Sequence, residues 1–163
     1  TFWFILENLK TNKFSININN HFLNIFFITI IIQIILGAFL AGLNGGLVYN
    51  SWPDMNGSFI PDDTIKTDLY NLESLNNASV IQFYHRLVAY ILILFLIILN
   101  YFFYKNKIEL KPIIFFNFAI LFQVTLGIVT LITGVKIYYA SLHQLGSVFV
   151  LSSFLFIYYK NTN

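Results

Sequence analysis

Four apolar segments, each long enough to cross a bilayer, constrain this chain more than any other feature of its sequence. A membrane-spanning helix needs about 20 predominantly apolar residues. The segments that meet this requirement are residues 22–43, 82–104, 112–134 and 138–159. Charged residues make up only 10% of the chain, whereas a soluble domain carries roughly 25%. The sequence therefore predicts an all-α membrane protein.

The basic residues predict how the four segments are oriented. Every loop on one side of the predicted bundle contains lysine: Lys10 and Lys13, then Lys105, Lys107 and Lys111, then Lys160. Such loops face the cytoplasm or the matrix by the positive-inside rule. The long connection 44–81 falls on the opposite side and is acidic. We therefore expect an up-down four-helix transmembrane bundle with both ends of the chain inside.

This topology divides the chain into three parts. We expect residues 1–21 to form an inner segment. Its start TFWFILENLK suggests the tail of a preceding helix, and an anchor at the membrane interface is the alternative. Residues 22–159 form the bundle and residues 160–163 an inner tail. We expect the outer loop 44–81 to fold over the bundle mouth as a lid. Its apolar anchors would be Tyr49, Trp52, Met55 and Phe59, although aromatic residues also gather at membrane interfaces without forming a lid.

Composition excludes several classes of function. The formal net charge of +2 is small and dispersed along the chain, so no nucleic-acid surface is expected. The chain has no cysteine, which excludes disulfides, thiolate metal sites and thiol nucleophiles within it.

Two hairpins of the predicted bundle share a weak internal repeat. The first segment contains QIILG, from Gln33 to Gly37, and the third contains QVTLG, from Gln123 to Gly127. The second segment contains HRL at His85 and the fourth contains HQL at His143. The shared order predicts a duplicated hairpin, with chance similarity between helices rich in leucine and isoleucine as the alternative.

His85 and His143 are the strongest candidates for a cofactor site. Both lie a few residues inside the outer ends of helices that run in the same direction. With a rise of 1.5 Å per residue, their depths agree within about one turn. Helices two apart in an up-down bundle can be diagonal neighbours, and bundle cores often hold cofactors between such helices. His21 precedes the first segment on the basic side and is expected at the surface.

The ligand of this pair is not decided by spacing alone. Zinc would require a third and a fourth ligand, whereas a haem with one axial imidazole on each face requires only two histidines and a slot. Small residues that would form the slot follow the histidines and glutamines on the same helix faces: Gly37, Ala41, Ala89, Gly127 and Ser147. Ordinary close packing of helices explains the small residues equally well. A proton relay or a metal site remain alternatives for the histidines.

Three other polar residues have two interpretations each. Arg86 could grip a haem propionate or reach the lipid headgroups. Gln33 and Gln123 could form interhelical hydrogen bonds or contact the edge of a cofactor.

These segments together resemble the C-terminal four-helix half of the haem A synthase family. The matching stretches are AGLNGGLVYNSWPDMNGSFIP, QFYHRLVAY, QVTLGIVTLITG and SLHQLGS. They occur in the family's order over about residues 22–155. The resemblance covers nearly the whole chain.

The resemblance implies both an activity and a division of labour. Family members oxidise a methyl group of haem O to the formyl group of haem A, and they consist of two similar four-helix halves. The C-terminal half holds haem b, with ligands that fall on His85 and His143. The N-terminal half holds the haem O substrate and an acidic residue that Glu7 does not match, so this chain alone is not expected to complete the reaction.

The resemblance also implies a location and partners. The membrane would be a bacterial plasma membrane or a mitochondrial inner membrane, with the histidine pair on the outer side. The partners would be lipid, the N-terminal half, haem O synthase or oxidase assembly factors, and further copies of the chain. Two rival functions are a membrane cytochrome b that carries electrons without making haem A, and a transporter or assembly subunit that binds no haem.

Overall fold

The computed structural model describes residues 2–8, 12–63 and 71–161, and this part of the chain is helical with no strand. Four of its helices are long and apolar enough to span a membrane, as the sequence predicts. The elements in chain order are α1 (Phe2–Asn8), α2 (Asn20–Gly42), η1 (Gly45–Leu47), η3 (Leu72–Asn76), α3 (Ala78–Lys105), α4 (Leu110–Ile132) and α5 (Ile137–Asn161). The chain is thus an integral membrane protein.

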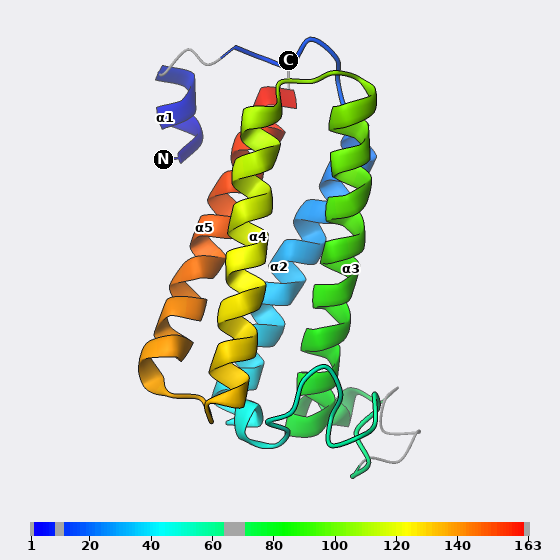
Figure 1. The fold of residues 1–163 in the computed structure, drawn as a ribbon, viewed down its shortest axis with the longest axis vertical. Helices are drawn as coiled ribbons and strands as arrows, with labels where there is room; N and C mark the ends of the chain where they lie inside the picture. Colours follow the sequence, from blue (N-terminus) through cyan, green and yellow to red (C-terminus); the bar gives the residue numbers. More distant parts are fainter. Residues whose placement is uncertain (1, 9–11, 64–70, 162–163) are drawn as a thin grey trace.

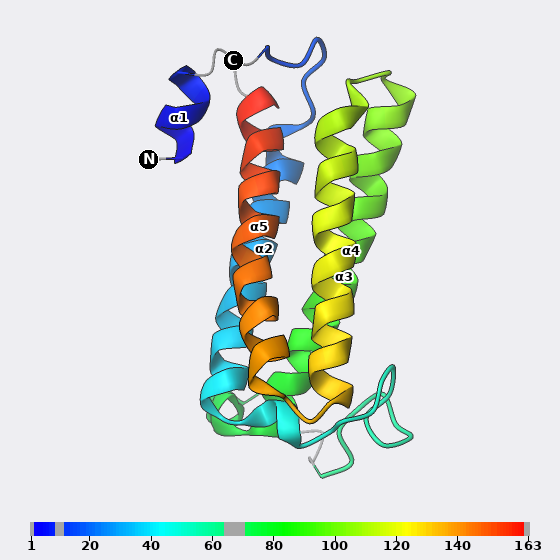
Figure 2. The ribbon, with the colours of Figure 1, turned by 60° about the vertical axis from the view of Figure 1, so that its left-hand side comes forward.

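The four long helices form an up-down bundle (Figure 1). The helix pairs in close contact are α2 with α3, α3 with α4, α4 with α5, and α2 with α5. Helices α3 and α5 are therefore diagonal to each other, and Figures 1 and 2 both show this arrangement. This confirms the arrangement on which the predicted histidine pair depends.

The two ends of the bundle differ in charge. One end, the lysine end, carries Lys13, Lys105, Lys107, Lys111 and Lys160. The other, the loop end, carries the connection between α2 and α3 and the short turn between α4 and α5. Lys10 lies outside the described residues, as do residues 64–70 of the long connection.

A capping side chain and a glycine explain why two helices differ from the predicted segments by a few residues. The Asn77 side chain accepts hydrogen bonds from the backbone N–H groups of Ser79 and Val80, and this N-cap begins α3 four residues before the predicted start. Gly134 has a φ of 69°, a conformation that glycine adopts easily. Helix α4 therefore ends at Ile132, two residues before the predicted end.

The hydrophobic core is concentrated toward the lysine end. Its members include Phe26, Leu99, Phe103, Phe116 and Phe154, and all five are completely inaccessible to solvent. Among the described residues, none after Ile30 in α2 and none before Val150 in α5 is buried. The half of the bundle toward the loop end, where the histidines lie, is therefore less densely filled with apolar side chains.

Hydrogen bonds at the lysine end join the segment before α2 to the end of α5, and the end of α5 to the start of α4. The Phe14 N–H donates to the Lys160 carbonyl at 2.8 Å, and the Ile18 N–H donates to Asn161 Oδ1 at 2.5 Å. Lys160 Nζ donates to Glu109 Oε2 at 2.6 Å. This hydrogen bond lowers the pKa of the Glu109 carboxyl. The segment before α2 is thereby fixed to the end of α5.

A reciprocal pair of amides joins α3 to α4 within the bundle. Asn100 Nδ2 donates to Asn117 Oδ1 at 2.8 Å, and Asn117 Nδ2 donates to Asn100 Oδ1 at 2.7 Å. Each amide thus satisfies the other, and an amide left unpaired in an apolar environment is unfavourable.

Candidate functional site

The imidazoles of His85 and His143 face each other across the bundle. Their ring centroids are 6.5 Å apart and the rings are inclined by 77°. The two side chains come from diagonal helices and both are half-buried. The structure thus brings together the two residues that the sequence predicts as a pair. His21, by contrast, is exposed.

His143 is held on both sides by residues of α4. Its Nδ1 lies 3.1 Å from the Gln123 carbonyl oxygen, and because a carbonyl only accepts, Nδ1–H must donate. In return, Gln123 Nε2 donates to the His143 carbonyl at 2.7 Å. A Cβ added to Gly127 would lie 2.9 Å from Cε1 of His143, so the ring rests directly on the backbone of α4. The imidazole is therefore fixed in place.

His85 is held by the equivalent residues of α2, but in a different way. Its Nε2 lies 3.3 Å from Gln33 Nε2, and since an amide nitrogen only donates, the imidazole nitrogen accepts. A Cβ added to Gly37 would lie 3.3 Å from Cε1 of His85. His85 Nδ1 is buried and has no hydrogen-bond partner among the described residues.

The repeated motif therefore serves one purpose in both hairpins. In each, a glutamine contacts a histidine of the following helix, and the glycine four residues later makes room for its ring. The sequence assigned these glycines to a slot for a porphyrin. In the structure, Gly37 and Gly127 face the imidazoles themselves.

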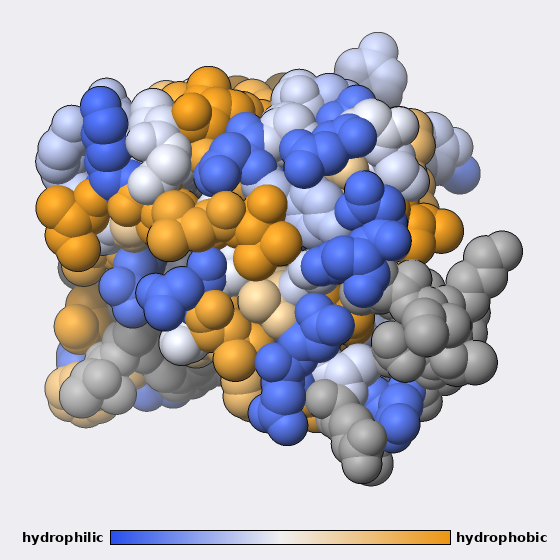
Figure 3. Space-filling view, turned by 90° about the horizontal axis from the view of Figure 1, so that it is seen from below, coloured by the Kyte–Doolittle hydropathy of each residue, from blue (hydrophilic) through white to orange (hydrophobic). Residues whose placement is uncertain are grey.

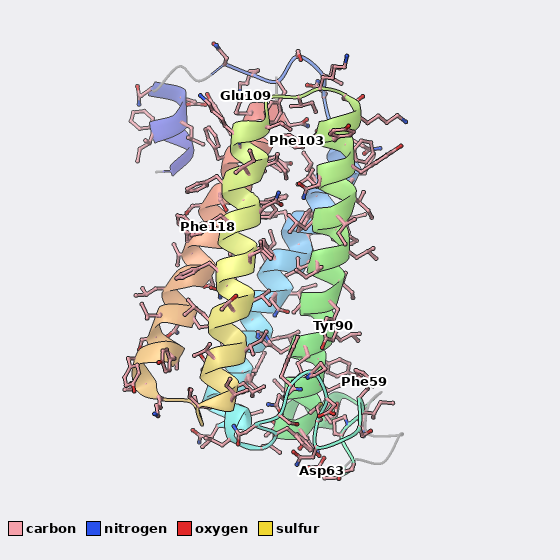
Figure 4. The ribbon with its side chains drawn as sticks, in the orientation of Figure 1. Phe59, Asp63, Tyr90, Phe103, Glu109 and Phe118 are labelled. Atoms are coloured by element: carbon pink, nitrogen blue, oxygen red, sulfur yellow. The ribbon has the colours of Figure 1, made fainter. Side chains whose placement is uncertain are left out.

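Arg86 holds the long connection against α3. It is half-buried, and its guanidinium donates to the carbonyls of Asp54 at 2.7 Å and Tyr49 at 3.2 Å. An apolar pocket of about 180 Å³ adjoins it, and Phe59 and Tyr90 are two of the lining residues. Figure 4 shows both on the outward side of α3. The structure thus places Arg86 at a contact between loop and helix.

Tyr49 is the centre of that contact and was not identified as such from the sequence. Its carbonyl accepts hydrogen bonds from Arg86 and from the buried Gln82. Its hydroxyl donates to Asp62 at 2.6 Å and Asp63 at 2.9 Å. The only available signal for Gln82 was its position one turn before Arg86.

The predicted apolar anchors of the connection are only partly correct. Tyr49 and Met55 are buried, but Trp52 and Phe59 are 48% and 71% exposed. The exposed pair conforms to the alternative interpretation, aromatic residues at a membrane interface. Seen from the loop end in Figure 3, hydrophobic patches alternate with hydrophilic ones. The connection packs mainly on α3, with one hydrogen bond from Asn50 to the Leu131 carbonyl of α4.

Comparisons with known proteins agree with the resemblance. The family model described as cytochrome oxidase assembly protein (COX15-CtaA) matches residues 2–155. The chain belongs to the haem A synthase family. A heme A synthase of Pelagibacter ubique is 56% identical over 99% of the chain, which corresponds to 48% of that protein. Heme A synthases of Wolbachia pipientis wMel and Rickettsia felis are 34% and 42% identical over 90% and 81% of the chain, or 41% and 40% of their own lengths.

The chain thus spans about half the length of the curated haem A synthases it matches. No solved structure gives a significant match. Membership of this family implies a haem cofactor, and the residues present can be tested against one.

The residues around the histidine pair fit a haem. Imidazole nitrogens bind metal ions at about 2.0–2.1 Å, so a distance of 6.5 Å between the ring centroids matches the separation of two rings with one ion between them. Three buried side-chain atoms beside the pair have no partner among the described residues: Gln33 Oε1, His85 Nδ1 and Gln123 Oε1. No third histidine or acid joins the pair among those residues, which argues against a zinc site.

The Tyr49 contact predicts how the stability of this haem A synthase-family chain depends on pH. Burial, together with the hydrogen bonds to Asp62 and Asp63, raises the pKa of Tyr49 to about 12. The folded state therefore holds this proton more tightly than the unfolded state, with its pKa of about 10. The resulting stability is complete below pH 10 and lost between pH 10 and 12. Unfolding in detergent over this range should show that loss, and Tyr49→Phe should remove it while Tyr104→Phe, an exposed tyrosine, should not.

Proposed function

We propose that this chain is the haem b-binding, C-terminal half of a haem A synthase, in which His85 and His143 would hold the haem iron. The observation that carries this proposal is the pair of imidazoles 6.5 Å apart on diagonal helices. The motif around each ring supports it, since glutamine and glycine occupy equivalent positions in both hairpins. The sparse apolar filling of this half of the bundle also supports it.

In this proposal the chain's own residues orient the ligands. The Gln123 carbonyl holds the Nδ1 proton of His143, which leaves the Nε2 lone pair available to iron. Gly37 and Gly127 let both rings lie against neighbouring helices. Haem with two histidine ligands carries single electrons and has no open coordination position for substrate. A hydrogen bond from Arg86 to a haem propionate stays a prediction. In the structure, Arg86 donates two hydrogen bonds to loop carbonyls.

The reaction itself would take place in the other half of the complete protein. There the methyl group of haem O would be oxidised to the formyl group of haem A, and this chain would pass electrons or support the fold. The lysines at one end of the bundle favour an inner location for that end. The histidine pair would then lie toward the outer side of a bacterial plasma membrane or a mitochondrial inner membrane.

A reduced-minus-oxidised spectrum of the purified chain tests the proposal, with pyridine-haemochrome quantification. We expect one low-spin haem b per chain, and none in the double variant His85→Ala/His143→Ala. The matched control is His21→Ala, which changes an exposed histidine and should keep the haem. A folded wild-type chain without haem would contradict the proposal and favour a transporter or assembly role. Haem without any haem A product, after the other half is supplied, would favour an electron carrier.

A further inference from the structure

The two histidines are held in different states by the same motif. In the second hairpin, the Gln123 amide binds the main chain of His143, and the imidazole binds the main chain of Gln123. In the first hairpin, the Gln33 amide instead binds the imidazole of His85 at 3.3 Å. Equivalent residues thus leave the two rings with different nitrogens free.

The ring of His143 is already arranged to bind a metal through Nε2. Its proton must be on Nδ1, because Nδ1 faces a carbonyl oxygen that can only accept. In a neutral imidazole the other nitrogen, Nε2, then carries the lone pair. Metal-binding histidines commonly donate their second N–H to such a carbonyl, which fixes ring orientation.

The ring of His85 cannot bind a metal through Nε2 in the arrangement seen here. That nitrogen is occupied by the Gln33 amide. If the amide were turned by 180°, its oxygen would face Nε2. Nε2 would then carry the proton and would have no lone pair to give to a metal. His85 Nδ1 and Gln33 Oε1, meanwhile, have no partner among the described residues, an unfavourable arrangement for buried polar atoms.

The second hairpin shows where the Gln33 amide could go. There the equivalent amide donates to the main-chain carbonyl of its histidine at 2.7 Å. If Gln33 adopted this arrangement, it would bind the His85 carbonyl and release Nε2. The same rotation would give the amide a partner that does not compete with a metal.

We propose that Gln33 is a positioning residue that caps His85 until haem enters, and that His143 is the ligand that binds iron first. This inference rests on the proposed bis-histidine haem site. When His85 ligates, the hydrogen bond between Gln33 and His85 Nε2 breaks and a bond between Nε2 and iron forms. With the Gln33 amide as donor, the His85 proton is on Nδ1 and stays there, so no proton is released.

Stopped-flow mixing of the haem-free chain with haemin tests this order. We expect two phases, a high-spin species with one histidine ligand followed by the low-spin species. Gln33→Leu removes the cap and should accelerate the second phase about five-fold. This is the factor that corresponds to the net free energy of one hydrogen bond. Gln144→Leu, an exposed glutamine beside His143, should leave both phases unchanged. If Gln33→Leu does not fold, Gln33→Met offers a side chain of similar length with the same expected result.

The single histidine variants give an independent measurement. His85→Ala should bind haemin with nearly wild-type stoichiometry and remain high-spin. His143→Ala should weaken haemin binding at least ten-fold, because the remaining ring is capped. Equal effects of the two variants, or an unchanged second phase in Gln33→Leu, would overturn this inference and leave the haem site intact. A wild-type chain that binds no haemin would contradict the proposed function itself.

Discussion

A leucine in place of Gly127 is expected to abolish the low-spin haem spectrum while the bundle still forms. The first added carbon would lie 2.9 Å from Cε1 of His143 and 3.5 Å from its Nε2. Both of these atoms belong to the imidazole ring. The backbone of α4 cannot yield at a packed helix contact, so the ring itself would have to move. The ring would leave the position that its hydrogen bond to Gln123 defines, and one axial ligand would be lost.

Alanine substitutions make this prediction quantitative. Alanine at Gly37 would place its Cβ 3.3 Å from the nearest atom of His85, and alanine at Gly42 would meet nothing within 4 Å. Low-spin haem per folded chain should therefore fall most for Gly127→Ala, less for Gly37→Ala and not at all for Gly42→Ala. Circular dichroism establishes that each variant is helical. If Gly127→Leu kept a wild-type spectrum, His143 would not be a ligand in the position described.

Replacing Asn117 with leucine is expected to destabilise the bundle by about 1–2 kcal/mol, the range of interhelical hydrogen bonds in membranes and of unsatisfied buried amides. The substitution removes both hydrogen bonds between α3 and α4 and leaves Asn100 Oδ1 without its donor. Asn100 Nδ2 would keep its other bond, to the Leu96 carbonyl at 2.8 Å. The measurement is the free energy of unfolding in mixed micelles as the denaturing detergent increases.

A double-variant cycle separates the amide pair from the size of the side chain. Asn100→Leu/Asn117→Leu should be destabilised by less than the sum of the two single variants, because no amide is then left unpaired. Thr125→Leu is the control on the same helix, since Thr125 is exposed and bonds within its own helix to Leu121. Additive single effects would show that the two amides act separately.

The loop end shows the limits of prediction from sequence most clearly. The propionate and headgroup roles expected for Arg86 stay predictions, and the hydrogen bonds that it donates to two carbonyls of the long connection were not anticipated. Trp52 and Phe59 were expected as anchors and are exposed. Side chains in a connection without periodicity have no pattern that tells which of them face inward, so the contacts of Tyr49 and Gln82 could not be anticipated.

The sequence by itself determined the membrane class, the four spans, their alternating direction and the equal depth of His85 and His143. These properties depend on the length of apolar runs, the distribution of lysines and the constant rise of a helix, all of which are local. The tertiary structure decided how each helix is rotated about its axis and which atoms meet across the bundle. The amide of Gln33 binds an imidazole and that of Gln123 a main-chain carbonyl, although the motifs read alike. That difference arises because each amide takes the partner that the packing of its neighbouring helix presents.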